Sequence, residues 1–194
     1  MPSKKLIILS GILLTSCVSE DAAPVIAALD YRLVCNPATG CAGRENMPAR
    51  TVKRGIDGQD NLRVGCYMGD RLADLALDFN GSGYGFSVNS SAPNSSSNCS
   101  VSIAEGNNTY EKTGCEISRG GEADCSESAA ADYDENVDEM PCQISVKTEG
   151  TTVTGTICCR NIPEEYKAAQ GNEYSLALSQ DMSKPARFEF TNCK

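Results

Sequence analysis

The stretch 142-CQISVKTEGTTVTGTICC-159 decides the fold that the sequence predicts. Apolar and polar residues alternate in both of its halves, and a turn that contains Gly150 separates them. Alternation with a period of two is typical of a strand with one buried face, so the stretch predicts a β-hairpin. One face of the first strand would hold Cys142, Ile144 and Val146, and one face of the second would hold Val153, Ile157 and Cys159.

The two adjacent cysteines at the end of this stretch constrain the disulfides. Successive side chains of a strand point to opposite faces of the sheet, so Cys158 and Cys159 cannot share a face. We therefore expect them to bond to different partners rather than to each other.

A second stretch, 99-CSVSIAEGNNTYEKTGC-115, resembles the first. Like residues 142–158, it opens with Cys-x-(Val/Ile)-Ser-(Ile/Val), has a glycine near its centre and closes on a cysteine. It predicts a second β-hairpin. The likeness fits the duplication of one unit, and it also fits a chance resemblance between two hairpins of one β-protein.

Short alternating segments continue through the rest of the chain. They are LRVGCYM (62–68), the end of RLADLALDF (71–79), GYGFSV (83–88), YSLAL (174–178) and RFEF (187–190). Only IPEEYKAAQG (162–171) suggests a short helix. The sequence thus predicts an all-β fold, mainly an antiparallel β-sandwich with disulfides and at most one or two short helices. We expect one domain over residues 31–194, preceded by a tether over residues 17–30.

The cysteine content predicts disulfides. Besides Cys17, the chain has an even set of ten: Cys35, Cys41, Cys66, Cys99, Cys115, Cys125, Cys142, Cys158, Cys159 and Cys193. An even number in an exported chain indicates a disulfide framework, and CNPATGC (35–41) would form a small closed loop. A zinc site is the alternative, but the chain has no histidine and no Cys-x-x-Cys pair, so we assign no metal ligand and no cofactor.

The N-terminal stretch 4-KKLIILSGILLTSC-17 predicts export. Two lysines precede an apolar run over residues 6–14, which is shorter than the roughly 20 residues of a membrane-spanning helix. The run has the length of the apolar region of a signal peptide, and residues 1–16 would be removed. An ordinary signal peptide cut nearby, with Cys17 left as a thiol, is the alternative.

The end of this stretch, Leu14-Thr15-Ser16-Cys17, resembles the lipobox of bacterial lipoproteins. The resemblance implies cleavage before Cys17, a diacylglyceryl group on its sulfur, and acylation (palmitate) of the new N-terminus. Two or more acyl chains hold a protein stably on a membrane. Val18, where an aspartate would favour the inner membrane, favours an anchor in the outer membrane, and the even number of remaining cysteines agrees with a lipidated Cys17.

The charge of the chain argues against nucleic acid as a partner. It carries 17 basic and 26 acidic residues, a net charge of −9, and the leader holds two of the lysines and no acid. Phosphate backbones would repel such a chain. Residues 122–139 are rich in carboxylates and predict an exposed acidic loop.

Two segments resemble calcium-binding loops. DYDENVDE (132–139) spaces its acids well, but Val137 and Gln143 stand where the loop needs glycine and glutamate. DFNGSG (78–83) matches better, but Asn89 stands where the bidentate glutamate belongs. A solvated acidic loop and a glycine-rich turn are the simpler interpretations.

The sequence offers no catalytic residue that we can assign. Without histidine the usual general base is absent, and no Gly-x-Ser-x-Gly motif occurs. We therefore expect a membrane-anchored protein of the cell envelope with a non-catalytic binding or structural role and an unidentified protein or glycan ligand. The alternatives are a calcium-dependent adhesion or carbohydrate-binding module and a histidine-free hydrolase. Tyr84, Phe86, Tyr110 and Tyr133 would form an exposed binding patch.

Overall fold

The computed structural model describes residues 22–35, 50–69, 74–90, 99–125, 140–163, 173–177 and 183–194. Within these ranges the chain forms strands and turns without a helix, which confirms the all-β prediction. The strands are β1 (Ile26–Cys35), β2 (Thr51–Ile56), β3 (Arg63–Met68), β4 (Leu75–Gly81), β5 (Tyr84–Ser90), β6 (Cys99–Glu105), β7 (Asn108–Thr113), β8 (Cys115–Arg119), β9 (Cys142–Glu149), β10 (Thr152–Pro163), β11 (Glu173–Ala177) and β12 (Ala186–Thr191).

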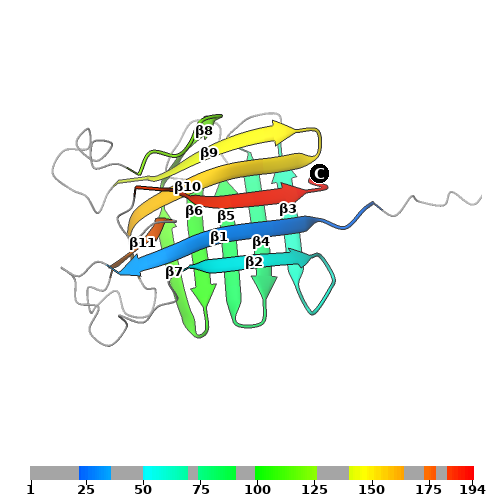
Figure 1. The fold of residues 1–194 in the computed structure, drawn as a ribbon, viewed down its shortest axis with the longest axis horizontal. Helices are drawn as coiled ribbons and strands as arrows, with labels where there is room; N and C mark the ends of the chain where they lie inside the picture. Colours follow the sequence, from blue (N-terminus) through cyan, green and yellow to red (C-terminus); the bar gives the residue numbers. More distant parts are fainter. Residues whose placement is uncertain are drawn as a thin grey trace, which may run out of the picture.

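The strands form two sheets that are stacked with their strands running crosswise (Figure 1). The small sheet has the order β3-β4-β5-β6-β7, an antiparallel meander. The large sheet has the order β2-β1-β12-β10-β9-β8, and its only parallel pair among the described strands is β8 with β9. Crosswise stacking is the orthogonal form of sheet packing.

β11 and β12 occupy the same position in the large sheet, end to end. β1 pairs with β12 over residues 26–30 and with β11 over residues 32–35. On the other side, β10 pairs first with β12 and then, beyond a register shift after Cys159, with β11. The position between β1 and β10 is thus filled along its length by two separate segments of the chain.

The core lies between the two sheets and uses the side-chain alternation that the sequence predicts. The expected faces of the 142–159 hairpin are buried together with those of the small sheet: Val64, Cys66, Leu75, Leu77, Phe79, Phe86, Val88, Val101, Ile103, Tyr110, Cys142, Ile144, Val146, Val153, Ile157 and Cys159. Phe86 of the small sheet and Phe188 of the large sheet meet with ring centroids 6.4 Å apart. The core is therefore a single contact layer between the two inner faces.

Four disulfides connect the described elements: Cys66–Cys193, Cys99–Cys115, Cys125–Cys158 and Cys142–Cys159. The prediction that Cys158 and Cys159 bond to different partners is confirmed. Such a set of disulfides is typical of proteins in an oxidising, extracytoplasmic compartment. Cys41, the predicted partner of Cys35, lies outside the described residues.

The predicted start of the domain at residue 31 is wrong, because β1 begins at Ile26. Val25, Ala27 and Leu29 face the core, while Ile26 lies on the outer face with 41% of its surface exposed. An exposed isoleucine and a buried alanine obscure the alternation in the sequence, so this part of β1 looked like a tether. Of the predicted helix 162–171, Ile162 and Pro163 belong to β10, and the rest lies outside the described residues.

Gly155 of β10 gives a direct test of the packing in the large sheet. It pairs with Phe188, and a Cβ added at Gly155 would lie 2.3 Å from the carbonyl oxygen of Ser145 and 2.4 Å from the Phe188 ring. Because neither group has room to retreat, we expect Gly155→Ala to lower the free energy of unfolding by about 1–3 kcal/mol. Urea denaturation of the purified protein measures this change.

The matched control is Gly65→Ala in β3, where the added Cβ would lie 3.6 Å from the nearest atom, Asp78 Cβ. This is an ordinary contact distance, and we expect a change of less than about 0.5 kcal/mol. Equal effects of the two substitutions would contradict the close approach of β10 to the Phe188 ring.

Candidate functional site

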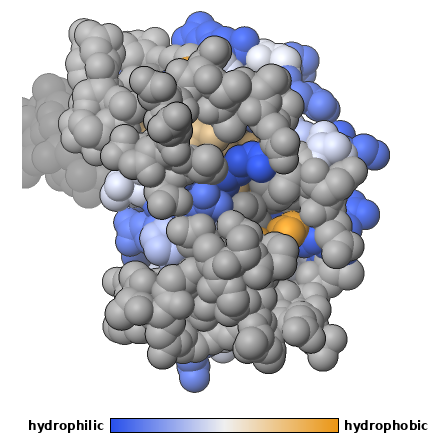
Figure 2. Space-filling view, turned by 90° about the vertical axis from the view of Figure 1, so that its left-hand side faces the viewer, coloured by the Kyte–Doolittle hydropathy of each residue, from blue (hydrophilic) through white to orange (hydrophobic). Residues whose placement is uncertain are grey.

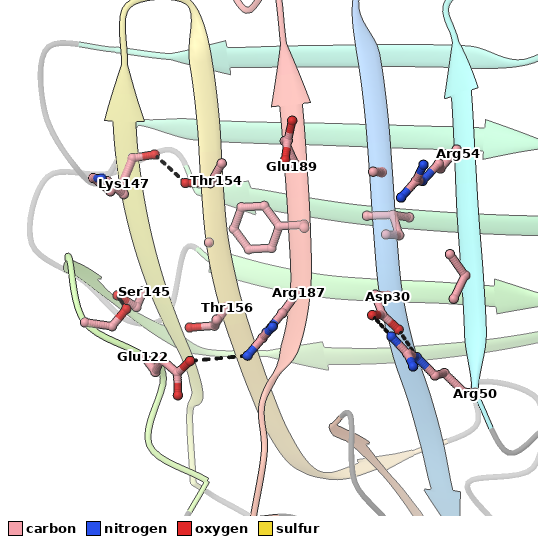
Figure 3. Close-up of a pocket in the computed structure, with 16 residues that line it drawn as sticks. Asp30, Arg50, Arg54, Glu122, Ser145, Lys147, Thr154, Thr156, Arg187 and Glu189 are labelled. Atoms are coloured by element: carbon pink, nitrogen blue, oxygen red, sulfur yellow. Dashed lines mark hydrogen bonds and ion pairs between the residues drawn. The ribbon is translucent and has the colours of Figure 1, made fainter.

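The outer face of the large sheet carries two parallel rows of polar side chains. Because neighbouring strands are in register, residues directly opposite one another share a face. One row runs across the sheet through Arg54, Ala28, Glu189, Thr154 and Lys147. The next row runs through Val52, Asp30, Arg187, Thr156 and Ser145 (Figure 3).

These rows form the floor of a groove with a volume of about 450 Å³. The small side chains Ala28, Thr154 and Thr156 lie on β1 and β10, the strands on either side of β12. Arg50, Val52 and Arg54 line the groove on the side of β2, and Gly121 and Glu122 line it on the side of β9. Figure 3 shows charged side chains both at the margins and on the central strand β12, which carries Arg187 and Glu189.

The wall on the β9 side is residues 120–125, which cross the outer face of the sheet. Ser145 donates a hydrogen bond to the carbonyl oxygen of Gly120 (2.6 Å), and the N–H of Ala123 donates to Thr156 Oγ1 (2.7 Å). The Cys125–Cys158 disulfide holds the end of the wall. These contacts explain why Ser145 and Thr156 are buried although they lie on the outer face.

Two ion pairs neutralise most of the charge in the groove. Arg50 of the β2 side binds both carboxylate oxygens of Asp30 through two hydrogen bonds. Arg187 lies 3.5 Å from Glu122 and so joins the floor to the wall. The side chains of Arg54 and Glu189, on either side of Ala28, form no hydrogen bond or ion pair within the described part of the chain.

A second cavity, of about 420 Å³, lies on the other side of β2, next to the turns of the small sheet at Gly83 and Gly106. Glu105 accepts hydrogen bonds there from Tyr31 (2.9 Å) and Thr51 (3.3 Å). The ammonium group of Lys53 lies 4.2 Å from the centre of the Tyr84 ring. These contacts fix β2 over the edge of the small sheet.

The predicted aromatic patch is wrong for two of its four members. Phe86 and Tyr110 are buried in the core, because both fall on the inward positions of their strands. Tyr84 is half-buried under Lys53, and Tyr133 lies outside the described residues. Hydrophilic residues dominate the coloured surface in Figure 2, and the exposed large hydrophobic side chains of the described chain are Ile26, Val52 and Tyr67.

The calcium-like segment at Asp78 forms the end of β4 and a tight turn, as the simpler interpretation predicted. Its carboxyl group accepts a hydrogen bond from Asn80 (2.6 Å) and lies 3.8 Å from Arg63. Partial burial raises the pKa of Asp78, and the positive charge of Arg63 opposes that rise. Within the described residues, no three acidic, cysteine or histidine side chains gather as metal ligands would. The other predicted segment, 132–139, and Cys17 lie outside those residues.

Sequence reasoning missed the groove, because its residues come from five strands far apart in the chain. The row positions follow from strand register, which one sequence does not reveal. Lys112 was missed although a signal existed: it shares the inward side of β7 with Tyr110. Its buried ammonium group donates to the carbonyl oxygen of Arg160 (2.5 Å), where β10 bulges, and so joins the two sheets.

Comparison with protein families, with curated proteins and with solved structures finds no match to this chain. A search of the described residues for a helix that is long and apolar enough to cross a membrane finds none.

Tyr31, next to the second cavity, makes the free energy of unfolding of the protein depend on pH. Burial, with the negative charge of Glu105 beside the hydroxyl, raises the pKa of Tyr31 well above its ordinary value. The folded state therefore favours the neutral phenol. The contribution of this group to the free energy of unfolding is complete below about pH 10 and falls as the pH rises above that value. Tyr31→Phe should lower the free energy of unfolding by about 1–2 kcal/mol at pH 7, since Glu105 loses a donor.

Denaturation at pH 7 and at pH 11 tests both statements. The loss of stability between the two pH values should be smaller in Tyr31→Phe than in the unchanged protein. Tyr67→Phe is the control, because Tyr67 is 54% exposed and should leave both the stability and its pH dependence nearly unchanged. An identical pH dependence in all three proteins would contradict the role of Tyr31.

Proposed function

We propose that this chain is a lipid-anchored, non-catalytic binding protein of the cell envelope, which takes its ligand in the groove on the outer face of the large sheet. The groove carries the proposal: it combines small and charged side chains on one concave surface, and ion pairs hold several of the charged groups in place. Ligand sites are usually concave and largely preformed, with a few well-placed polar groups.

The ion pairs of the groove favour binding over catalysis. Asp30 is bound at both oxygens by Arg50, and Glu122 is next to Arg187, so these carboxylates act as anchors for the positions of the two arginines. Arginines held in this way present fixed donors to a ligand without paying the entropy of ordering them on binding. The unidentified ligand is a protein or a glycan.

The lipid anchor is supported by the position of β1. The first strand begins at Ile26, which leaves residues 17–25 between the proposed lipidation site and the sheet. Nine extended residues reach roughly 30 Å, enough to hold the domain next to a bilayer with freedom to rotate. The lipobox-like sequence ending at Cys17 and the disulfides, which favour an extracytoplasmic location, also support it.

Intact mass spectrometry of the protein extracted from membranes tests the anchor. We expect the mass of residues 17–194 plus a diacylglyceryl group and a further acyl chain. Cys17→Ala should remove the lipid mass and release the protein from the membrane fraction, because the chain then carries no acyl group that inserts into the bilayer. A lipid-free native protein, with or without the leader, would refute this part of the proposal.

A photo-crosslinking residue at Thr154, on the floor of the groove, tests the binding role in the host cell. We expect a discrete adduct from this position. The control is the same residue at Glu111, an exposed position of β7 in the other sheet. Adducts from both positions or from neither would refute a ligand in the groove.

A further inference from the structure

We propose that β2 is a docking strand, to which an acidic segment of a partner protein adds in an extended conformation by main-chain hydrogen bonds. This inference goes beyond the proposed function, since the partner is held by main-chain groups along the edge of β2, a strand whose side chains also line the groove. Strand addition of this kind is a common mode of peptide recognition.

Among the described strands, β2 pairs with β1 only, so its other edge is free of any described strand. The N–H of Asp57, just after β2, donates to the carbonyl oxygen of Val25 at 2.8 Å. In an antiparallel pair, residues that exchange hydrogen bonds alternate with residues that do not. Counting back from Asp57, the main-chain groups of Thr51, Lys53 and Gly55 face β1. The main-chain groups of Val52 and Arg54 therefore face away from the sheet. Within the described chain these groups form no hydrogen bond.

The space beside this edge is open on both sides. The outer groove reaches β2 at Arg50, Val52 and Arg54, and the second cavity reaches it at Thr51 and Lys53. A strand added here would point alternate side chains toward Arg54 on one side and toward the cavity beside Tyr84 on the other. Val52, with 55% of its surface exposed, offers apolar contact along the same edge.

The charge of the edge identifies the kind of partner. Arg50, Lys53 and Arg54 lie within five positions of one another on a chain whose net charge is −9, and of these Arg50 is paired with Asp30 and Lys53 lies over the Tyr84 ring. Arg54 has no ion pair among the described residues. An acidic segment would supply the missing negative charge, whereas a basic one would be repelled.

The same charges oppose the pairing of β2 with a second copy of itself. An antiparallel pair of two β2 strands with its twofold axis at Lys53 or at Arg54 places that residue directly opposite its own copy. Like charges directly opposite across strands are destabilising, and charged edges are a known protection against such self-association. The edge thus excludes its own copy while it stays complementary to an acidic strand.

Two substitutions change the edge of β2, where Val52 and Arg54 also line the near side of the groove, and a third changes the far side of the groove. Val52→Pro removes a donor from the free edge and keeps the hydrogen bonds to β1, since proline is tolerated where its position faces away from the sheet. Arg54→Glu reverses a charge on the edge. The matched control is Lys147→Glu, an exposed basic residue of β9 at the far end of the same row.

The measurement is fluorescence anisotropy of the full chain in detergent micelles with two labelled peptides. One alternates glutamate with valine, and the other alternates lysine with valine. We expect the glutamate peptide to bind at least about tenfold more tightly than the lysine peptide, and Val52→Pro and Arg54→Glu each to weaken it about tenfold or more. Lys147→Glu should change its affinity less than about twofold.

Amide hydrogen exchange provides the second measurement, and it needs no variant. The glutamate peptide should protect the amides of Val52 and Arg54, which lie on the free edge. If both variants bind the peptide as well as the unchanged protein does, or if neither peptide binds that protein, the proposal is wrong.

Two further outcomes would also overturn the proposal, because they would show a different binding site or a different partner. Loss of binding in Lys147→Glu alone would place the peptide in the outer groove. A dimer of the unchanged protein in sedimentation that Val52→Pro dissociates would assign the edge to a second copy. Should Val52→Pro fail to fold, Arg54→Glu and the exchange of the two amides decide the question alone.

Discussion

The alternation of side chains along β10 governs both faces of the large sheet. Cys159 points inward and joins Cys142 in the core, while Cys158 points outward and holds the end of the groove wall through Cys125. Successive side chains of a strand point to opposite faces of the sheet. One strand therefore fixes the core on its inner face and the wall of the groove on its outer face, with no residue between the two connections.

The groove and the free edge of β2 meet at Arg54, which lines one and belongs to the other. Arginines and a lysine gather at this margin, although acidic residues outnumber basic ones in the whole chain. The overall charge of the chain is a poor guide to what binds there.

Most strands could be predicted because apolar and polar residues alternate within short segments of the sequence, as in 62–68 and 142–159. The opposite directions of Cys158 and Cys159 followed from the same rule. Strand order could not be predicted, since it depends on contacts between distant segments, such as the pairing of β1 with β12. The position of β8, parallel to β9, and the path of residues 120–125 across the sheet are further consequences of that order. The groove was therefore hidden, although three of its strands, β9, β10 and β12, were predicted; β1 and β2 were not.

The position of β12 determines when the large sheet can be completed. This strand, from residues 186–191, lies between β1 and β10, and Cys193 next to it bonds to Cys66 of the small sheet. Until these residues are available, residues 26–30 of β1 have no partner on that side, and only β11 joins β1 to β10. A chain that crosses a membrane with its N-terminus first would thus remain incompletely folded until nearly all of it had passed through.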